Sequence, residues 1–286
     1  MEWWFGLCLR TRSHLGFEIV GTAHELLPLE QVFEDDFRAR DFLLSKASAV
    51  IALSDATAAE LNALGAGYVR VIRMGSYGDP NPVRLTTEEA RASFGFDHDD
   101  VAAVLLGRIE GYKGADLLLL AAKQLPPTSR IKVLLVGSCS DSRYRKELNR
   151  LATEAGKKVA MRLEWVPDDD VARYLQASDM AAFPFREVIN SGSVRLAQSF
   201  VRPVVIPDLP ALGDVPNSTA IRFEPRNDQG VEPLVAALRQ AEQLSAAEYR
   251  DMSITALTWA SRIDWATTAH ETIETYRTVC HGPISG

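Results

Sequence analysis

The sequence predicts an α/β protein built on parallel sheets. Short apolar runs alternate with longer amphipathic stretches along most of its 286 residues, which is the pattern of repeated strand–helix–strand units. Two of these runs, Val101–Leu106 and Ile131–Val136, end directly at glycines, as buried strands do where they enter a tight turn. The pattern therefore predicts Rossmann-like domains.

The first 75 or so residues predict a small unit of three strands. The strands are expected at Phe17–Thr22, Ala49–Leu53 and Tyr68–Arg73, with helices at Phe33–Lys46 and Ala56–Leu64 and one more before residue 17. Ser54 and Asp55 supply a capping start for the second of the listed helices. Three parallel strands are few for an autonomous domain, because the edges of the sheet stay open.

A second and longer series follows the breaker-rich stretch Met74–Pro82, which is a credible domain boundary. A short helix at Thr87–Phe94 leads into it. Its strands are expected at Val101–Leu106, Ile131–Val136, Met161–Trp165, Met180–Phe183, Pro203–Ile206 and Ala220–Phe223. Helices are expected near 115–124, 142–156, 168–177, 193–200, 231–243, 245–261 and 265–280. This set is close to a complete Rossmann-like domain.

Composition excludes several classes of protein. The chain is 47% apolar and 24% charged, which is the balance of a globular protein. Its net charge of −7 argues against a general nucleic-acid binder, and no apolar run approaches the roughly 20 residues that span a bilayer. Its three cysteines, Cys8, Cys139 and Cys280, show no metal-ligand spacing, so a reducing cytoplasm is the expected location.

The most informative segment surrounds the end of the first long apolar run. Gly107 ends this run, Arg108 and Lys113 come just after it, and a helix begins at Ala115. In open parallel sheets ligands bind at the carboxyl ends of strands, where glycines admit the backbone and helix N-termini favour anions. An arginine and a lysine there can hold a diphosphate. The same two residues are also compatible with ordinary surface cations at a strand–helix turn.

Further motifs follow in a fixed order. They are Gly137-Ser138, Trp165-Val166-Pro167, Tyr174-Leu175, Ser178-Asp179, Pro184-Phe185-Arg186-Glu187, Ser191-Gly192-Ser193 and Arg202-Pro203-Val204-Val205. With the Arg108/Lys113 turn, this order resembles the nucleotide-sugar domain of family-4 retaining glycosyltransferases of the GT-B fold, over about residues 101–240. The stretch from Thr22 to Pro28 resembles the histidine motif of their N-terminal domain, and Asp264-Trp265 resembles the start of their last helix.

The resemblance implies a division of the chain. Residues 1–78 would form a partial, acceptor-side Rossmann-like domain, residues 79–262 the nucleotide-sugar domain, and residues 263–286 a helix that crosses back to the first. The strands and glycine-rich loop that open the N-terminal domain in this family are not present before residue 17. We therefore expect self-association through residues 1–75, or a partner chain that completes this domain.

The resemblance also implies the activity. It predicts transfer of a sugar from a nucleotide-diphosphate sugar to the hydroxyl of an unidentified acceptor, for a polysaccharide, a glycolipid or a natural product. The reaction would proceed with retention, without metal or other cofactor, in the cytoplasm or at the inner membrane surface. The expected incompleteness of the N-terminal domain leaves an alternative open, namely a truncated homologue that binds nucleotide sugar or a partner without transferring sugar. A Rossmann dehydrogenase is a weak third option because no Gly-x-Gly-x-x-Gly follows a strand.

Roles for individual residues follow from the same resemblance. Arg108 and Lys113 would hold the diphosphate and neutralise it as it leaves, Glu187 would accept hydrogen bonds from the donor sugar, and His24 would touch that sugar from the other domain. Backbone at Gly107 and Gly137 and the start of the helix at Ser191, Gly192 and Ser193 would line the donor, with Trp165 and Val166 beside the nucleobase.

Each of these residues also has a purely structural explanation. Glu187 is compatible with a solvated loop carboxylate, Ser191 or Ser193 with a helix N-cap, His24 with a packed histidine and Trp165 with the core. Three consecutive acids, Asp168–Asp170, complement the positive end of a helix more simply than they bind a metal.

One position departs from the family. Many members grip the ribose with a second glutamate, eight residues after the first. Here that position is Arg195, followed by Leu196, and neither side chain can accept those hydrogen bonds. The nucleotide must therefore be held differently, or the donor differs.

Overall fold

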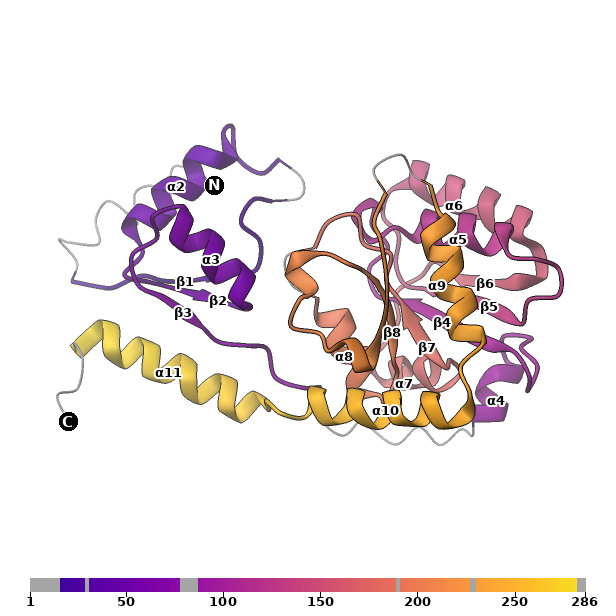
Figure 1. Cartoon of the computed structure of the whole chain (residues 1–286). Coiled ribbons are helices and arrows are strands. Elements are labelled where there is room, and N and C mark those ends of the chain that lie inside the picture. The colour runs from indigo at the N-terminus through magenta and orange to yellow at the C-terminus, as the bar shows by residue number, and fades with distance from the viewer. Residues whose placement is uncertain (1–15, 29–30, 78–86, 189–190, 227–229, 282–286) are drawn as a thin grey trace. The chain divides into compact units, whose positions relative to one another are not determined.

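The computed structural model describes residues 16–28, 31–77, 87–188, 191–226 and 230–281, which form two units (Figure 1). Unit 1 contains the described residues up to Gly75, the short segment Pro210–Asp214 and the chain from Ile263 onward. Unit 2 contains Ser76–Leu209 and Val215–Arg262. Every strand pairing in both units is parallel, which confirms the predicted α/β class. No helix within these ranges is long and apolar enough to cross a bilayer.

Unit 1 is built on a three-stranded sheet in the order β1-β2-β3. Its elements are β1 (Val20–Ala23), α2 (Asp36–Lys46), β2 (Ala49–Ala52), α3 (Asp55–Ala63) and β3 (Val69–Val71). Side chains cap both helices: Asp35 accepts the amide of Arg38, and Ser54 accepts the amide of Thr57. The first of these caps makes α2 begin three residues later than predicted. Small and aliphatic side chains form the core, namely Ala23, Leu44, Val50, Ala52, Ala58, Leu61 and Ala66. The helix expected before residue 17 lies outside the described residues.

The last helix, α11 (Trp265–His281), is also part of unit 1. The hydroxyl of Thr268 donates to the carbonyl of Arg73 at 2.9 Å, and Thr275 is fully buried. At Gly75 a Cβ atom would stand 2.6 Å from the amide nitrogen of Trp265, so the chain passes very close to the start of this helix. Thr275 lies on the buried face of this helix, whereas Trp265, Ile273 and Tyr276 are 46–48% exposed.

Unit 2 contains a six-stranded sheet in the order β6-β5-β4-β7-β8-β9. The strands are β4 (Val101–Leu106), β5 (Ile131–Val136), β6 (Val159–Arg162), β7 (Met180–Ala182), β8 (Val204–Pro207) and β9 (Ala220–Phe223). The predicted strand Met161–Trp165 is therefore placed too late. It ends at Arg162 because the carbonyl of that residue accepts the amide of Gly137, where β5 itself turns away.

Helices cover both faces of this sheet (Figure 1). They are α4 (Thr87–Ala92), α5 (Ala115–Gln124), α6 (Ser142–Ala155), α7 (Asp168–Gln176), α8 (Gly192–Ser199), α9 (Glu232–Glu242) and α10 (Ala246–Ala260). Helices α5, α6 and α9 pack on one face, whereas α7, α8 and α10 lie on the other. The chain leaves β4 toward the first face and β7 toward the second. In such sheets the crevice between the two carboxyl ends is the place where ligands bind.

Candidate functional site

Two glycines bring the ends of neighbouring strands together. Gly107 follows β4 with φ +122° and Gly137 follows β5 with φ +142°, a region that side chains other than glycine rarely adopt. A Cβ atom on Gly137 would stand only 1.7 Å from the carbonyl oxygen of Gly107. Both turns are fixed further by a backbone hydrogen bond from Ile109 to Ser138 at 2.8 Å. The two glycines thus allow the turns after β4 and β5 to pack directly against each other.

Lys113 is the cation at the centre of this edge. It ends a short 3-10 turn (Gly111–Lys113) and is only 8% exposed. A Cβ atom placed on Gly107 would lie 3.2 Å from its Nζ and 3.7 Å from the Oγ of Ser193, so three of the predicted site residues meet here. Burial lowers the pKa of the ammonium group, partly opposed by Glu110. No ion pair of Lys113 is found within the described part of the chain.

Arg108, the other predicted diphosphate ligand, has a different environment. Its side chain is 70% exposed, and its Nε lies 2.8 Å from a carboxylate oxygen of Glu110. An exposed pair of this kind contributes little to stability and exchanges partners readily. Arg108 is therefore an exposed cation beside the buried Lys113, not a second buried one.

The start of α8 supplies backbone donors and two serines with separate functions. Ser191 is the N-cap, and its Oγ accepts the amide of Val194 at 3.2 Å. The structural explanation given above therefore applies to Ser191. Ser193 does not cap the helix; its Oγ faces the region of Gly107 and Lys113. The N-terminus of α8, which is the positive end of the helix, therefore places the Ser193 hydroxyl near the buried ammonium group of Lys113.

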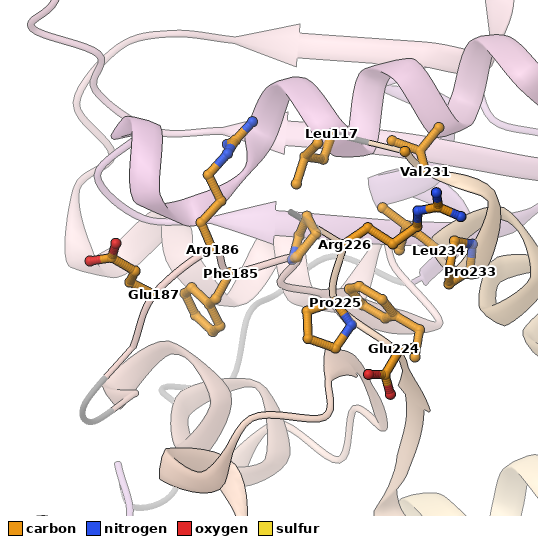
Figure 2. Close-up of a pocket in the computed structure, with 13 residues that line it drawn as sticks. Leu117, Phe185, Arg186, Glu187, Glu224, Pro225, Arg226, Val231, Pro233 and Leu234 are labelled. Carbon is orange, nitrogen blue, oxygen red and sulfur yellow. The ribbon is translucent and has the colours of Figure 1, made fainter. Parts of the chain in front are cut away.

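The loop after β7 carries Glu187. Gly114, at φ +69°, allows this loop to approach the turn after β4, since a Cβ atom there would be 2.0 Å from the carbonyl oxygen of Pro184. Figure 2 shows the side chain of Arg186 directed toward the helix that bears Leu117 and that of Glu187 directed away from it. Glu187 is exposed. It also borders a cavity of about 350 Å³, whose other walls come from α5, the loop after β9 and the start of α9.

The remaining predicted residues lie on other segments. Trp165 is 72% exposed in the loop between β6 and α7, so the core interpretation of this residue is wrong, and Val166 beside it is half-buried. His24 follows β1 in unit 1 and is exposed, which does not fit a packed histidine. Asp168–Asp170 form the first turn of α7, and the described residues contain no cluster of three possible metal ligands.

Arg195 shows how the chain uses the position of the absent second glutamate. The residue is 7% exposed, and its guanidinium lies 4.4 Å from the ring centre of Trp259 on α10. It therefore joins α8 to α10 rather than serving as an acceptor toward the crevice.

Sequence reasoning missed three polar residues that join the loops of the site. They are Asp116, Tyr144 and Arg186, which form one hydrogen-bonded group. A signal for two of them exists, because Asp116 comes three residues after Lys113 and Arg186 comes directly before Glu187. Tyr144 has no comparable signal in the sequence.

Comparison with known proteins finds a family model and solved structures that are similar to this chain. Residues 86–192, which include Arg108, Lys113 and Glu187, match the family described as Glycosyl transferases group 1. Two solved structures cover nearly all of the chain at 21% identity: sucrose-phosphate synthase from Thermosynechococcus elongatus, with TM-score 0.78 over 96% of this chain and 71% of that one, and HepE from Anabaena in complex with UDP-glucose, with TM-score 0.80 over 94% and 75%. The fold is GT-B-like.

A curated relative of this GT-B-like chain is the D-inositol 3-phosphate glycosyltransferase of Rhodococcus opacus. It is 28% identical over 214 residues, which are 68% of this chain and 46% of that protein. The GT-B-like chain thus spans about half the length of the curated relatives that it matches.

Proposed function

We propose that this protein is a retaining glycosyltransferase that uses a nucleoside-diphosphate sugar as donor and a hydroxyl group as acceptor. The observation that carries the proposal is the meeting of a buried ammonium group, a glycine turn and a helix N-terminus at the carboxyl ends of the strands in unit 2. A desolvated cation beside backbone donors is suited to a diphosphate, whose charge grows as the sugar departs. The match to a glycosyl transferase domain supports this choice of anion.

In the proposed transfer reaction the two cations and the leaving phosphate each have a defined role. The bond between the anomeric carbon and the phosphate oxygen breaks while Lys113 and Arg108 neutralise the leaving diphosphate. The acceptor oxygen bonds to the same face of that carbon, and its proton passes to the departing phosphate. An oxocarbenium-like sugar between the two steps matches the transition state of glycoside hydrolysis. Two protein cations supply the charge neutralisation, so the proposed reaction runs without a metal ion.

The other predicted residues complete the proposed donor site. Glu187 accepts hydrogen bonds from sugar hydroxyls, and Ser193 with the amides of the α8 N-terminus binds phosphate oxygens. Trp165 and Val166 border the nucleobase. UDP-glucose is a suitable first donor to test, since one of the similar structures contains it. The acceptor would belong to a polysaccharide, a glycolipid or a natural product.

Titration with UDP and GDP by calorimetry, followed by a UDP-glucose hydrolysis assay with and without EDTA, tests the proposal. We expect one nucleotide to bind and the donor to be hydrolysed equally in both conditions. Binding without hydrolysis or transfer would favour the alternative, a nucleotide-sugar-binding homologue. Absence of binding by either nucleotide, or a strict need for a divalent cation, would contradict the proposed site.

Replacement of Glu187 by glutamine tests the sugar contact. We expect turnover of UDP-glucose to fall about tenfold or more while UDP affinity changes little, because UDP lacks the sugar that the carboxylate contacts. Glu88→Gln on α4 is the matched control, since this exposed glutamate does not line the cavity that Glu187 borders, and it should behave like the wild type. Equal losses for both ligands in Glu187→Gln would place this residue away from the sugar.

A further inference from the structure

One carboxylate joins three loops at the carboxyl edge of the sheet in unit 2. Asp116 stands in the first turn of α5, after the turn that follows β4. Its two oxygens accept hydrogen bonds from Nη1 and Nη2 of Arg186, at 2.9 and 2.6 Å. The hydroxyl of Tyr144, on the first turn of α6 after β5, donates to the same carboxylate at 2.6 Å. Segments after β4, β5 and β7 therefore share one acceptor.

Arg186 also grips the turn that carries Lys113. Its Nη1 donates to the carbonyl of Gly111 at 2.8 Å, and its backbone amide donates to the carbonyl of Tyr112 at the same distance. Both acceptors are within two residues of Lys113. A planar guanidinium that makes a bidentate salt bridge and a backbone contact fixes orientation as well as distance.

The surroundings of Asp116 and Tyr144 keep the carboxylate ionised and the phenol protonated, as the hydrogen bond from Tyr144 to Asp116 requires. Burial alone would raise the pKa of Asp116, but hydrogen bonds from Arg186 and Tyr144 lower it below its usual range. Burial and the neighbouring carboxylate raise the pKa of Tyr144, so this side chain remains a donor. The side chains of Asp116 and Arg186 are 15% and 33% exposed, which makes the pair stronger than an ordinary surface ion pair.

We propose that Arg186 is a positioning residue that sets Glu187 relative to Lys113, an inference that rests on the proposed function of both. The two residues are neighbours in one loop, yet Arg186 is anchored to the turn after β4 while Glu187 projects elsewhere (Figure 2). Transfer requires the sugar contact and the diphosphate contact at a fixed separation, and a shift of about 1 Å costs up to about a hundredfold in rate. Diphosphate binding alone makes no such demand.

Two uncharged variants test whether Arg186 acts on turnover and not on diphosphate affinity, the shortened Arg186→Gln and the isosteric Asp116→Asn. Each should lower the turnover of UDP-glucose at saturating donor about ten- to hundredfold, while the Kd for UDP stays within about threefold of the wild type. The double variant should be no worse than either single variant, because both remove the same contact. Tyr144→Phe keeps the salt bridge and should show a smaller loss. Arg150→Gln on α6 is the control, since this exposed arginine also pairs with two carboxylates and should leave turnover unchanged.

Hydrogen exchange of the full chain supplies a reading independent of activity. Peptides covering residues 107–117 and 180–187 should exchange faster in both variants, with the rest of unit 2 unaffected. Unchanged turnover, additive losses, or a parallel fall in UDP affinity and in protection throughout unit 2 would overturn the positioning role. A wild-type chain that binds neither UDP nor GDP would instead refute the proposed function, and that failure appears before any variant is made.

Discussion

The two ends of the six-stranded sheet both hold buried cations, but the cations have different partners. At the amino end Arg91 forms an ion pair with Asp179, which also accepts the amide of Ala102 at 2.7 Å. Arg202 there bonds to the carbonyl of Leu175 and to the hydroxyl of Tyr249, at 2.8 and 3.0 Å. At the carboxyl end Lys113 is as buried as Arg91, yet no carboxylate pairs with it among the described residues.

This difference separates cations that are paired within the fold from Lys113, the cation that we propose binds a ligand. A buried charge with a fixed counter-charge becomes costly only when one partner is removed. A buried charge without a partner destabilises the free protein and gains its partner on binding. Replacing a cation at the amino end should therefore lower the free energy of unfolding and leave UDP affinity unchanged, and replacing Lys113 should do the reverse. Equal responses at the two ends would contradict this distinction.

Gly137→Ala should have the largest effect of all. The added Cβ atom would stand 1.7 Å from the carbonyl oxygen of Gly107, so the turns that form the carboxyl edge must separate. We expect a loss of about 4 kcal/mol or more in the free energy of unfolding, measured by urea denaturation, and no detectable UDP binding. Gly95→Ala is the control, since Gly95 also has positive φ but has open space around it, and it should cost only about 1–2 kcal/mol. Similar losses in the two variants would mean that close approach of the turns is unimportant.

Arg91→Met tests the amino end of the sheet. Removal of the guanidinium leaves Asp179 partly buried without its counter-charge and should lower the free energy of unfolding by about 3 kcal/mol. UDP affinity of the folded protein should remain that of the wild type, because Arg91 belongs to the opposite edge. Denaturation and calorimetry on the same preparation measure both quantities. A specific loss of UDP affinity would remove the distinction between the two ends.

Lys113→Met should give the reverse result. UDP affinity should fall about ten- to hundredfold, the effect of losing a charge-assisted contact of about 1.5–3 kcal/mol, while the free energy of unfolding rises by about 1 kcal/mol near pH 7. Lys123→Met, which removes a surface lysine paired with Glu154, should leave UDP affinity unchanged.

The free energy of unfolding of the wild type and that of Lys113→Met should depend differently on pH, because the pKa of Lys113 is lowered in the folded protein. Between the folded and the unfolded pKa, the unfolded chain binds more protons, so wild-type stability rises with pH through this window. Lys113→Met lacks this contribution, and its stability advantage should therefore shrink as the pH rises toward the usual lysine pKa of about 10.4. An advantage that grows with pH would show that the ammonium group is stabilised in the folded protein.

Substitutions of the two serines at the start of α8 should have the smallest effects. One should change mainly the stability of the fold and the other mainly UDP affinity. Ser191→Ala removes the N-cap and should lower stability by about 1 kcal/mol with little change in UDP affinity. Ser193→Ala should weaken UDP about three- to tenfold with little change in stability, because its hydroxyl faces the crevice. The opposite assignment would mean that Ser193, not Ser191, serves as the cap.

Local patterns in the sequence predicted most of the fold. Strands β4 and β5 were predicted to the residue because each is an apolar run followed directly by glycine, interrupted only by Lys132 in β5. The start of α2 was misplaced because Asp35 and Asp36 offer adjacent capping positions, and the end of β6 because its limit is set by a hydrogen bond to Gly137 on another strand. Such cross-strand limits have no local signature.

Within the candidate site, the sequence predicted the residue types but not their environments. It placed Arg108 and Lys113 together as equivalent cations, whereas burial of one and exposure of the other depend on how close the turns approach. Exposure of Trp165 and the packing of Arg195 against Trp259 depend likewise on segments distant in the sequence. The Asp116–Tyr144–Arg186 group required the topology, because its members come from three separate connections.

Unit 1 contains residues from both sides of unit 2, which has a consequence for synthesis of the protein. About 190 residues separate Gly75 from Ile263, so a ribosome adding roughly 5–20 residues per second needs about 10–40 s before α11 can emerge. Throughout that interval the surface that receives Thr268 and Thr275 stays uncovered, and by its end all of unit 2 has been synthesised. The second unit to begin is therefore the first that can finish folding.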